Sequence, residues 1–274
     1  MLLCIDIGNT NTVLATFEGE KLIHSWRIKT DARSTADELG LKLRGLLAGD
    51  AVEVTGVAAC STVPAALRSL RAMLARYYGD IPNVIVEPGV KTGVQLAIDN
   101  PKEVGADRVV NTLAAFTLYG GPSIVVDFGT TTNFDVISGR GEFLGGAFAP
   151  GIEISFDALA DRAAQLRKVE PTRPRSVIGK NTVECLQSGM YFGFAGQVDR
   201  IVERMTEELG PVRAVIATGG LAPLMAGTSE TISEFVPDLT LLGLRLTYLR
   251  NTRTTSVNNG SSNSPADVSG RVAR

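Results

Sequence analysis

The sequence predicts an α/β protein of two duplicated lobes, each with the element order βββαβαβ, separated by a cleft. The first observation is a repeat. The stretch LLCIDIGNTNTVLATF near the N-terminus returns from residue 123 as SIVVDFGTTTNFDVI, so a buried strand ends twice on Asp-x-Gly and a polar turn. The second is that strand and helix patterns follow each copy in the same order. Duplicated lobes leave a cleft between them, which is a preferred position for a ligand site.

The first unit is assigned to residues 1–118. Its strands, which lie between turn residues, are predicted at 1–5, 12–17, 22–28, 54–60 and 83–87. One helix begins at about residue 35, after the capping residues Ser34 and Thr35, and a second begins at Pro64, a residue favoured in the first helical turn.

The second unit is assigned to residues 119–250. A helix from Glu103 to Tyr119 is predicted to bridge the two units, because its apolar residues share one face. The strands and helices that follow are predicted at 123–127, 132–137, 141–149, 152–167, 180–209 and 213–220. Residues 251–274 lack apolar periodicity and are rich in Ser, Asn and Thr, which predicts a disordered tail.

Composition narrows the class of function. The chain has 274 residues, 44% of them hydrophobic, and a net charge of −2, so it offers no basic surface for nucleic acid or anionic lipid. No apolar stretch is long enough to span a bilayer, and the N-terminus does not resemble a signal peptide. The cysteines, Cys4, Cys60 and Cys185, lack metal-binding spacing. These features predict a reduced, cytoplasmic protein without nucleic-acid or membrane partners.

The two Asp-x-Gly turns have the chemistry of phosphate binding. A glycine lets a phosphate approach backbone N–H groups, because no side chain intervenes. Asp6 and Asp127 repel a phosphate, but each can hold a cation, or its waters, against one. A single such turn is also an ordinary capped hairpin, whereas one in each unit favours a metal–polyphosphate gripped from both sides. Further hydroxyl donors are Thr10, Thr12, Thr130 and Thr131.

Asp107 and Arg108 lie one turn into the bridging helix, beside the predicted cleft. A carboxylate at this position can take a proton from an alcohol, and a guanidinium can pair with a substrate carboxylate through two hydrogen bonds. The helix dipole alone also favours an exposed aspartate at a helix N-terminus. The residues by themselves therefore leave a catalytic and a structural interpretation open.

Five motifs, in this order along the chain, resemble those of type III pantothenate kinases: DIGNTNT, NPKEVGADRVVN (100–111), DFGTTTN, GGAFAPG (145–151) and GKNT (179–182). The resemblance covers about residues 1–250. It implies an actin-like ATPase fold with two ribonuclease-H-like lobes, as in acetate and sugar kinases, Hsp70 and actin. It also implies a homodimer that phosphorylates pantothenate to 4′-phosphopantothenate with ATP and Mg²⁺, the first step of coenzyme A biosynthesis.

The resemblance further implies residue roles. Asp107 is expected to be the catalytic base, and Asp127 to bind a monovalent cation, either K⁺ or NH₄⁺. The expected ATP contacts are Asp6, Ile7, Gly8, Asn9, Thr10, Asn11, Thr12, Val13 and Thr130. The expected pantothenate contacts are Gly105, Ala106, Asp107, Arg108 and Thr182.

One position departs from the family pattern, and two other functions stay open. Ile98 stands near the substrate where many members carry a tyrosine, which leaves room for a kinase of another small alcohol. A non-catalytic regulator on the same fold is the second alternative, although it would not need Asp6, Asp107 and Asp127 together.

Glycines within the predicted helix 180–209 also need an explanation. Each costs about 1 kcal/mol relative to alanine in a helix, so close packing is expected to compensate, either inside the protomer or across a dimer. The glycines concerned are Gly189, Gly193 and Gly196.

Overall fold

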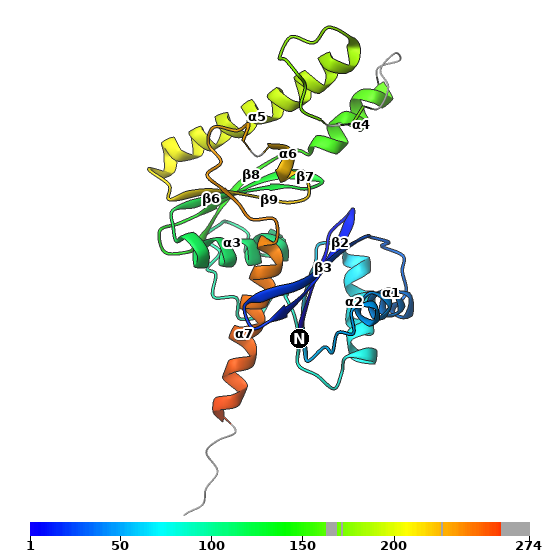
Figure 1. Ribbon diagram of the computed structural model, residues 1–274. Helices are drawn as coiled ribbons and strands as arrows, with labels where there is room; N and C mark the ends of the chain where they lie inside the picture. The colour runs from blue at the N-terminus through cyan, green and yellow to red at the C-terminus, as the bar shows by residue number, and fades with distance from the viewer. Residues whose placement is uncertain (163–168, 171, 226, 259–274) are drawn as a thin grey trace, which may run out of the picture.

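The computed structural model describes residues 1–162, 169–170, 172–225 and 227–258, and it contains two five-stranded sheets of the same topology (Figure 1). The first sheet has the order β3-β2-β1-β4-β5, and the second has the matching order β8-β7-β6-β9-β10. In each, the three strands that come first in sequence pair antiparallel, and the remaining pairings are parallel. This confirms the predicted duplication.

The strand bounds agree with the sequence analysis to within a few residues. The first sheet comprises β1 Leu2–Ile7, β2 Asn11–Glu18, β3 Lys21–Lys29, β4 Gly56–Ser61 and β5 Asn83–Ile85. The second comprises β6 Ser123–Phe128, β7 Thr131–Ile137, β8 Phe143–Pro150, β9 Ala214–Thr218 and β10 Glu234–Phe235. Only β10, which completes the second unit, had no predicted range.

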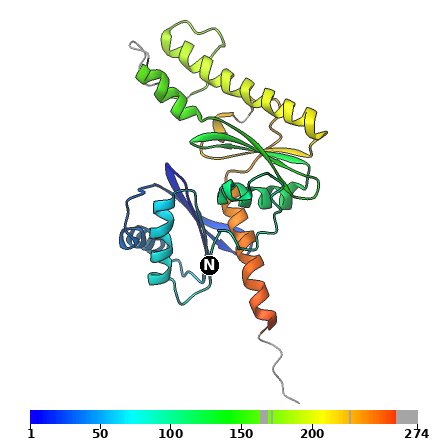
Figure 2. The ribbon, with the colours of Figure 1, turned by 180° about the vertical axis from the view of Figure 1, so that it is seen from behind.

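One layer of helices covers the outer face of each sheet (Figures 1 and 2). On the first sheet these are α1 Ala36–Gly49 and α2 Pro64–Tyr77, which pack on the buried side chains of β1. On the second they are α4 Ile152–Arg162, α5 Thr182–Leu209 and α6 Ala222–Met225. Helix α1 begins with the predicted cap, since the Thr35 hydroxyl accepts from the Glu38 N–H and the Glu38 carboxylate accepts from the Thr35 N–H.

Helices α3 Ala106–Tyr119 and α7 Leu239–Asn258 pack against each other and against the inner faces of both sheets. Val110 of α3 and Leu244 of α7 join the core of the first sheet, whereas Ala114 and Leu239 join the core of the second. A Cβ at Gly243 of α7 would overlap the backbone of α3, so glycine permits this close approach. The helix pair therefore connects the lobes and fixes the bottom of the cleft.

Two predicted boundaries are wrong. Helix α3 begins at Ala106 rather than Glu103, because Gly105 is extended at its N-cap (φ −62°, ψ 143°) and a short 3₁₀ turn, Pro101–Glu103, precedes it. Helix α7, which had no predicted range, extends over residues 251–258, where the sequence predicted a disordered tail.

Tertiary contacts explain why the chain is helical beyond residue 250. The side-chain amide of Asn251 donates to the carbonyl oxygen of Lys91 at 3.1 Å and accepts from the Lys91 N–H at 3.3 Å, so the helix is held to a loop of the first lobe. The rest of the predicted tail, 259–274, and the helical pattern at 163–167 lie outside the described residues. Within the described ranges, no helix is long and apolar enough to cross a membrane.

Candidate active site

Strand alternation explains why the two buried strands end on carboxylates. On β1, Leu3 and Ile5 face the outer helices, so Cys4 and Asp6 face the interior between the lobes. On β6, Val126 faces the outer helices and Asp127 takes the opposite face. The duplication therefore presents two carboxylates, one from each lobe, to the same interlobe space.

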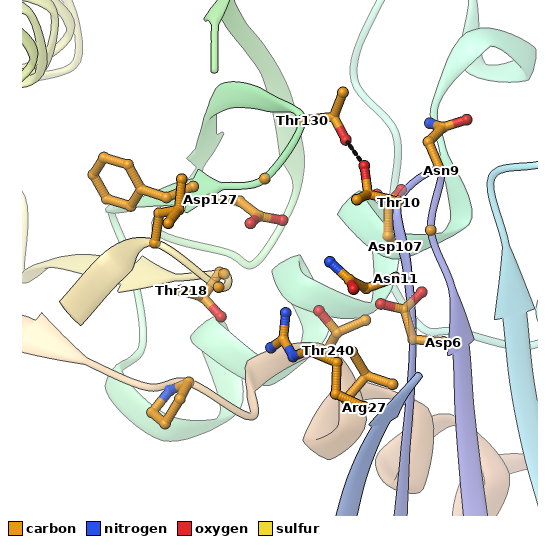
Figure 3. A pocket seen from close by; sticks show the side chains of 18 of the residues that line it. Asp6, Asn9, Thr10, Asn11, Arg27, Asp107, Asp127, Thr130, Thr218 and Thr240 are labelled. Atoms are coloured by element: carbon orange, nitrogen blue, oxygen red, sulfur yellow. Dashed lines mark hydrogen bonds between the residues drawn. The ribbon is translucent and has the colours of Figure 1, made fainter. Parts of the chain in front are cut away.

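A cavity of about 660 Å³ occupies that space (Figure 3). Both Asp-x-Gly turns, the start of α3, the start of α7 and the turn after β9 form its walls. Asp6, Asp107 and Asp127 therefore reach one cavity from three different elements.

Asp107 projects into the cavity from the first turn of α3. One of its carboxylate oxygens, Oδ1, accepts from the N–H of Arg108 at 2.9 Å, which fixes the side chain near the helix end. A Cβ at Gly105 would lie only 2.5 Å from that same oxygen. The glycine of the GADR motif thus makes room for the carboxylate.

The cavity carboxylates perturb one another. Burial, together with the nearby Asp107 and Asp6 carboxylates, raises the pKa of Asp127 from 3.8 to about 8. Burial and Asp107 raise the pKa of Asp6 to about 7, although the Cys60 thiol opposes this by donating to Asp6 Oδ1 at 3.3 Å. Burial also raises the pKa of Asp107. The site therefore has an excess of negative charge, which is the charge expected of a cation-binding site.

Each of the two turns is closed by a backbone hydrogen bond from its glycine, and the two turns touch each other. In the first, the N–H of Gly8 donates to the carbonyl of Asn11, and in the second the N–H of Gly129 donates to that of Thr131, both at 3.0 Å. The hydroxyls of Thr10 and Thr130, one from each turn, lie 3.1 Å apart (Figure 3).

Two glycines leave the space that the second turn occupies. A Cβ at Gly151, the last residue of the GGAFAPG motif, would overlap the carbonyl oxygen of Thr130. A Cβ at Gly219, after β9, would overlap the Asp127 carboxylate, and its φ of +92° also favours glycine. These two glycines therefore permit the close packing behind the second turn.

Most of the expected ATP contacts line the cavity, namely Asp6, Gly8, Asn9, Thr10, Asn11, Val13 and Thr130. Asp107 and Asp127 line it as well. Ile7 and Thr12 do not, because strand alternation turns them to the outer side, where each is 3% exposed. The Thr12 hydroxyl is bonded there to Thr30 at 2.9 Å.

The expected pantothenate contacts are less concentrated. Of these residues, Gly105, Ala106, Arg108 and Thr182 do not line the cavity. Arg108 turns toward the second sheet, where its Nε donates to Asp135 Oδ1 at 2.7 Å and its guanidinium lies over the rings of Phe143 and Phe148. Asp135 is fully buried, and its second oxygen has no hydrogen-bond partner in the described structure.

Thr182 and the helix glycines lie away from the cavity, on α5. Thr182 is exposed, and Asn181 before it caps the helix by accepting from the Glu184 N–H at 3.0 Å. A Cβ at Gly189, Gly193 or Gly196 would meet nothing within 4 Å. Close packing inside the protomer therefore does not explain these glycines.

Several cavity residues had no sequence signal that marked them. They are Arg27 on β3, Thr62 after β4, Glu153 on α4, and Asp238 and Thr240 at the start of α7. Each lies on an element whose approach to the cavity depends on packing between distant segments, and none belongs to a motif. Only the Gly219–Gly220 pair, at the end of a predicted strand, had a weak signal as an approach for a nucleoside.

A metal ion bound in this cavity would need ligands other than protein side chains. In the described part of the chain, no three or more His, Cys, Asp or Glu side chains are grouped closely enough to hold an ion by themselves. This arrangement fits Mg²⁺, which is commonly held by one or two carboxylates together with substrate phosphates and waters.

Known proteins with similar sequences belong to one family. A family model described as type III pantothenate kinase matches residues 2–204. The type III pantothenate kinase of Salinispora arenicola is 84% identical over 251 residues, which are 92% of this chain and 100% of that protein. That of a Parafrankia species is 64% identical over 252 residues, covering 92% and 99%.

Solved structures show the same fold at low identity. An activator of 2-hydroxyisocaproyl-CoA dehydratase from Clostridium difficile, with bound ADPNP, superposes with a TM-score of 0.58 at 13% identity and covers 97% of this chain and 99% of its own. A conserved putative Baf family transcriptional activator from Campylobacter jejuni gives 0.56 at 17% identity, covering 92% and 99%. These likenesses confirm the predicted two-lobed fold.

Proposed function

Since the chain belongs to the type III pantothenate kinase family and phosphorylates pantothenate with ATP and Mg²⁺ in coenzyme A biosynthesis, we propose that the interlobe cavity is its active site. The observation that carries this proposal is the convergence of Asp6, Asp107 and Asp127 between the two Asp-x-Gly turns. No other arrangement in the described residues joins phosphate-binding turns to a carboxylate that can act as a base.

Asp107 is the proposed general base. One of its carboxylate oxygens takes the proton of the pantothenate primary alcohol as the alcohol oxygen attacks the γ-phosphorus of ATP. The new oxygen–phosphorus bond forms while the bond to the bridging oxygen breaks, and ADP leaves. The raised pKa of Asp107 supports this role, because a more basic carboxylate is a better proton acceptor.

The turns are the proposed seat of the phosphates. Gly8 and Gly129, with the hydroxyl-bearing residues Thr10 and Thr130, line the cavity from both lobes. Stabilising a transferring phosphoryl group depends mainly on such positioning and on positive charge. Mg²⁺ bound to the nucleotide supplies part of that charge.

Asp127 would hold the monovalent cation, K⁺ or NH₄⁺. Its half-buried carboxyl has no hydrogen bond to another side chain in the described residues. Burial and, after it, neighbouring carboxylates raise its pKa, so a cation beside it would relieve the repulsion. Equal activity in buffers containing only sodium and in buffers containing potassium would contradict this part of the proposal.

A homodimer is the proposed assembly, and α5 is its proposed contact surface. The glycines of α5 leave open space beside the helix, and the apolar side chains of Val177, Ile178 and Val183 are exposed next to Thr182. In such a dimer, Thr182 of one subunit would contact pantothenate bound in the cavity of the other subunit. Mixing inactive Asp107→Asn and Thr182→Ala subunits tests this, because only a dimer that shares its sites would regain activity.

Cytoplasmic location stays part of the proposal, supported by three free cysteines. Arg108 stays a proposed pantothenate contact, although Asp135 already engages it, so the substrate carboxylate would have to use its remaining donors.

The decisive experiment is an ATP-consumption assay with pantothenate, sugars and acetate as acceptors, with and without potassium. Turnover with pantothenate alone supports the proposal. Turnover with another alcohol would favour a kinase of a different substrate, the alternative that Ile98 leaves open. ATP binding without any turnover would favour a non-catalytic regulator.

A further inference from the structure

The cavity has an unusual balance of charge for a nucleotide site. Its lining contains five acidic side chains, Asp6, Asp107, Asp127, Glu153 and Asp238, and among the described lining residues a single basic one, Arg27. Neither Asp-x-Gly turn contains a lysine or an arginine. A triphosphate entering this cavity therefore meets several carboxylates, and Arg27 is the one cationic side chain that the described wall offers to it.

Arg27 reaches across the cleft. It lies on β3, an edge strand of the first sheet, and its guanidinium points into the cavity (Figure 3). A Cβ at Gly220, in the turn after β9 of the second lobe, would lie only 2.8 Å from Arg27 Nη1. The missing side chain at Gly220 thus makes room for a guanidinium from the opposite lobe.

No hydrogen bond or ion pair holds the guanidinium in the described part of the chain, and the Arg27 side chain is exposed. Its electrostatic interactions are with cavity carboxyls, because its charge opposes the burial-driven rise in the pKa of Asp6 and of Asp238. Other arginines on the described surface behave differently, for example Arg71 and Arg76, each of which pairs with a carboxylate. An unpaired guanidinium, with five donors in a planar fork, is suited to phosphate oxygens.

We propose that Arg27 binds the phosphate chain of the nucleotide and carries positive charge from the first lobe to the turn at Gly219–Gly220 of the second. This inference rests on the proposed function, because it takes the cavity to be the ATP site. Arg27 would contact the phosphates directly and would also hold the two lobes together over the nucleotide.

The test compares Arg27→Ala, Arg27→Lys and Lys29→Ala. Lys29 is a matched control, because it is exposed on the same face of the same strand but does not line the cavity. Calorimetry with Mg²⁺ measures the affinity of each protein for a non-hydrolysable ATP analogue, ADP and adenosine, and a melting curve shows that each variant is folded.

We expect Arg27→Ala to weaken binding of the ATP analogue on the order of ten- to a hundredfold, the usual effect of a charge-assisted hydrogen bond, and to leave adenosine unchanged. Arg27→Lys should recover part of the loss, and Lys29→Ala should bind like the parent protein. Unchanged affinity for the ATP analogue in Arg27→Ala would overturn the inference. An equal loss for adenosine would also overturn it, because Arg27 would then contact the base.

The two proposals can fail separately. If the parent protein does not transfer phosphate to pantothenate, the proposed function fails, whatever the binding data show. If it does so and Arg27→Ala binds the ATP analogue normally, only the role of Arg27 fails.

Discussion

The hydroxyls of Thr10 and Thr130 lie 3.1 Å apart, although the two residues belong to different lobes. Thr10 lies two residues after the Asp-x-Gly of the first turn, and Thr130 lies directly after that of the second, so the contact joins neighbouring but not equivalent positions of the duplicated units. Their contact joins the two proposed phosphate turns directly at the edge of the cavity. The turns therefore form one continuous surface toward a nucleotide.

Replacing Thr130 with valine should raise the KM for ATP about two- to tenfold, because a hydrogen bond of this kind contributes about 0.5–1.5 kcal/mol. Thr130→Ser keeps the hydroxyl and should resemble the parent enzyme. Steady-state kinetics on both variants measure the effect. Equal KM values for the valine and serine variants would show that the hydroxyl contact is unimportant.

Asp107→Asn should abolish most turnover while leaving the fold and ATP binding intact. Asparagine has nearly the same volume but cannot accept the proton of the alcohol. General-base catalysis contributes about 10²- to 10⁴-fold, and the lower half of that range is expected for a loose phosphoryl-transfer transition state. Asp99→Asn, an exposed change outside the cavity, is the control. A variant that keeps more than about a third of the parent kcat would show that Asp107 is not the base.

Arg108→Ala should both raise the KM for pantothenate and destabilise the fold. The stability loss arises because Asp135, whose side chain is 1% exposed, would keep a buried charge without its partner, which typically costs about 3–5 kcal/mol. The double variant Arg108→Ala with Asp135→Asn should regain stability but not the KM. Urea denaturation and kinetics separate the two effects. A normal KM in the stable double variant would rule out Arg108 as a substrate contact.

Gly151→Ala should weaken ATP binding and lower the melting temperature. The added Cβ would overlap the carbonyl oxygen of Thr130, which is backbone and can move away only if the second turn shifts. Gly45→Ala, at an exposed helix position with nothing within 4 Å, is the matched control and should stabilise the protein by up to about 1 kcal/mol. Nucleotide affinity like that of the parent in Gly151→Ala would show that the turn tolerates the displacement.

Without nucleotide or small cations, the protein should lose stability as the pH rises from about 5 to about 8. The reason is the raised pKa of Asp127, about 8, and of Asp6, about 7: the folded protein binds these protons more tightly than the unfolded chain, whose carboxyls titrate near 3.8. The stabilising proton is present below the unfolded pKa and is lost as the pH passes the folded pKa.

Melting temperatures in a buffer of large organic cations measure this dependence. Asp127→Asn should flatten it, and potassium or Mg–ATP should restore stability to the parent protein at pH 8. A parent protein whose melting temperature does not fall over this interval would contradict the assigned shifts.

The sequence by itself determined the elements that local rules control. Strand alternation and turn residues located the strands around Asp6 and Asp127, and their repetition revealed the duplication, because side-chain period and turn chemistry depend only on neighbouring residues. Motif resemblance supplied the family and Asp107. The N-cap at Thr35 was also predictable, since a capping box is a pattern of four consecutive residues.

Tertiary structure alone decided the rest. Four features depend on contacts between residues far apart in sequence. Helices α3 and α7 pack on both sheets, and Asn251 bonds to Lys91 where the helix extends into the predicted tail. Arg108 turns toward Asp135, and Arg27 reaches Gly220. Such contacts depend on how two lobes pack across their shared helices. The periodicity of one segment carries no information about where another segment packs. These contacts can therefore be identified only from the folded structure.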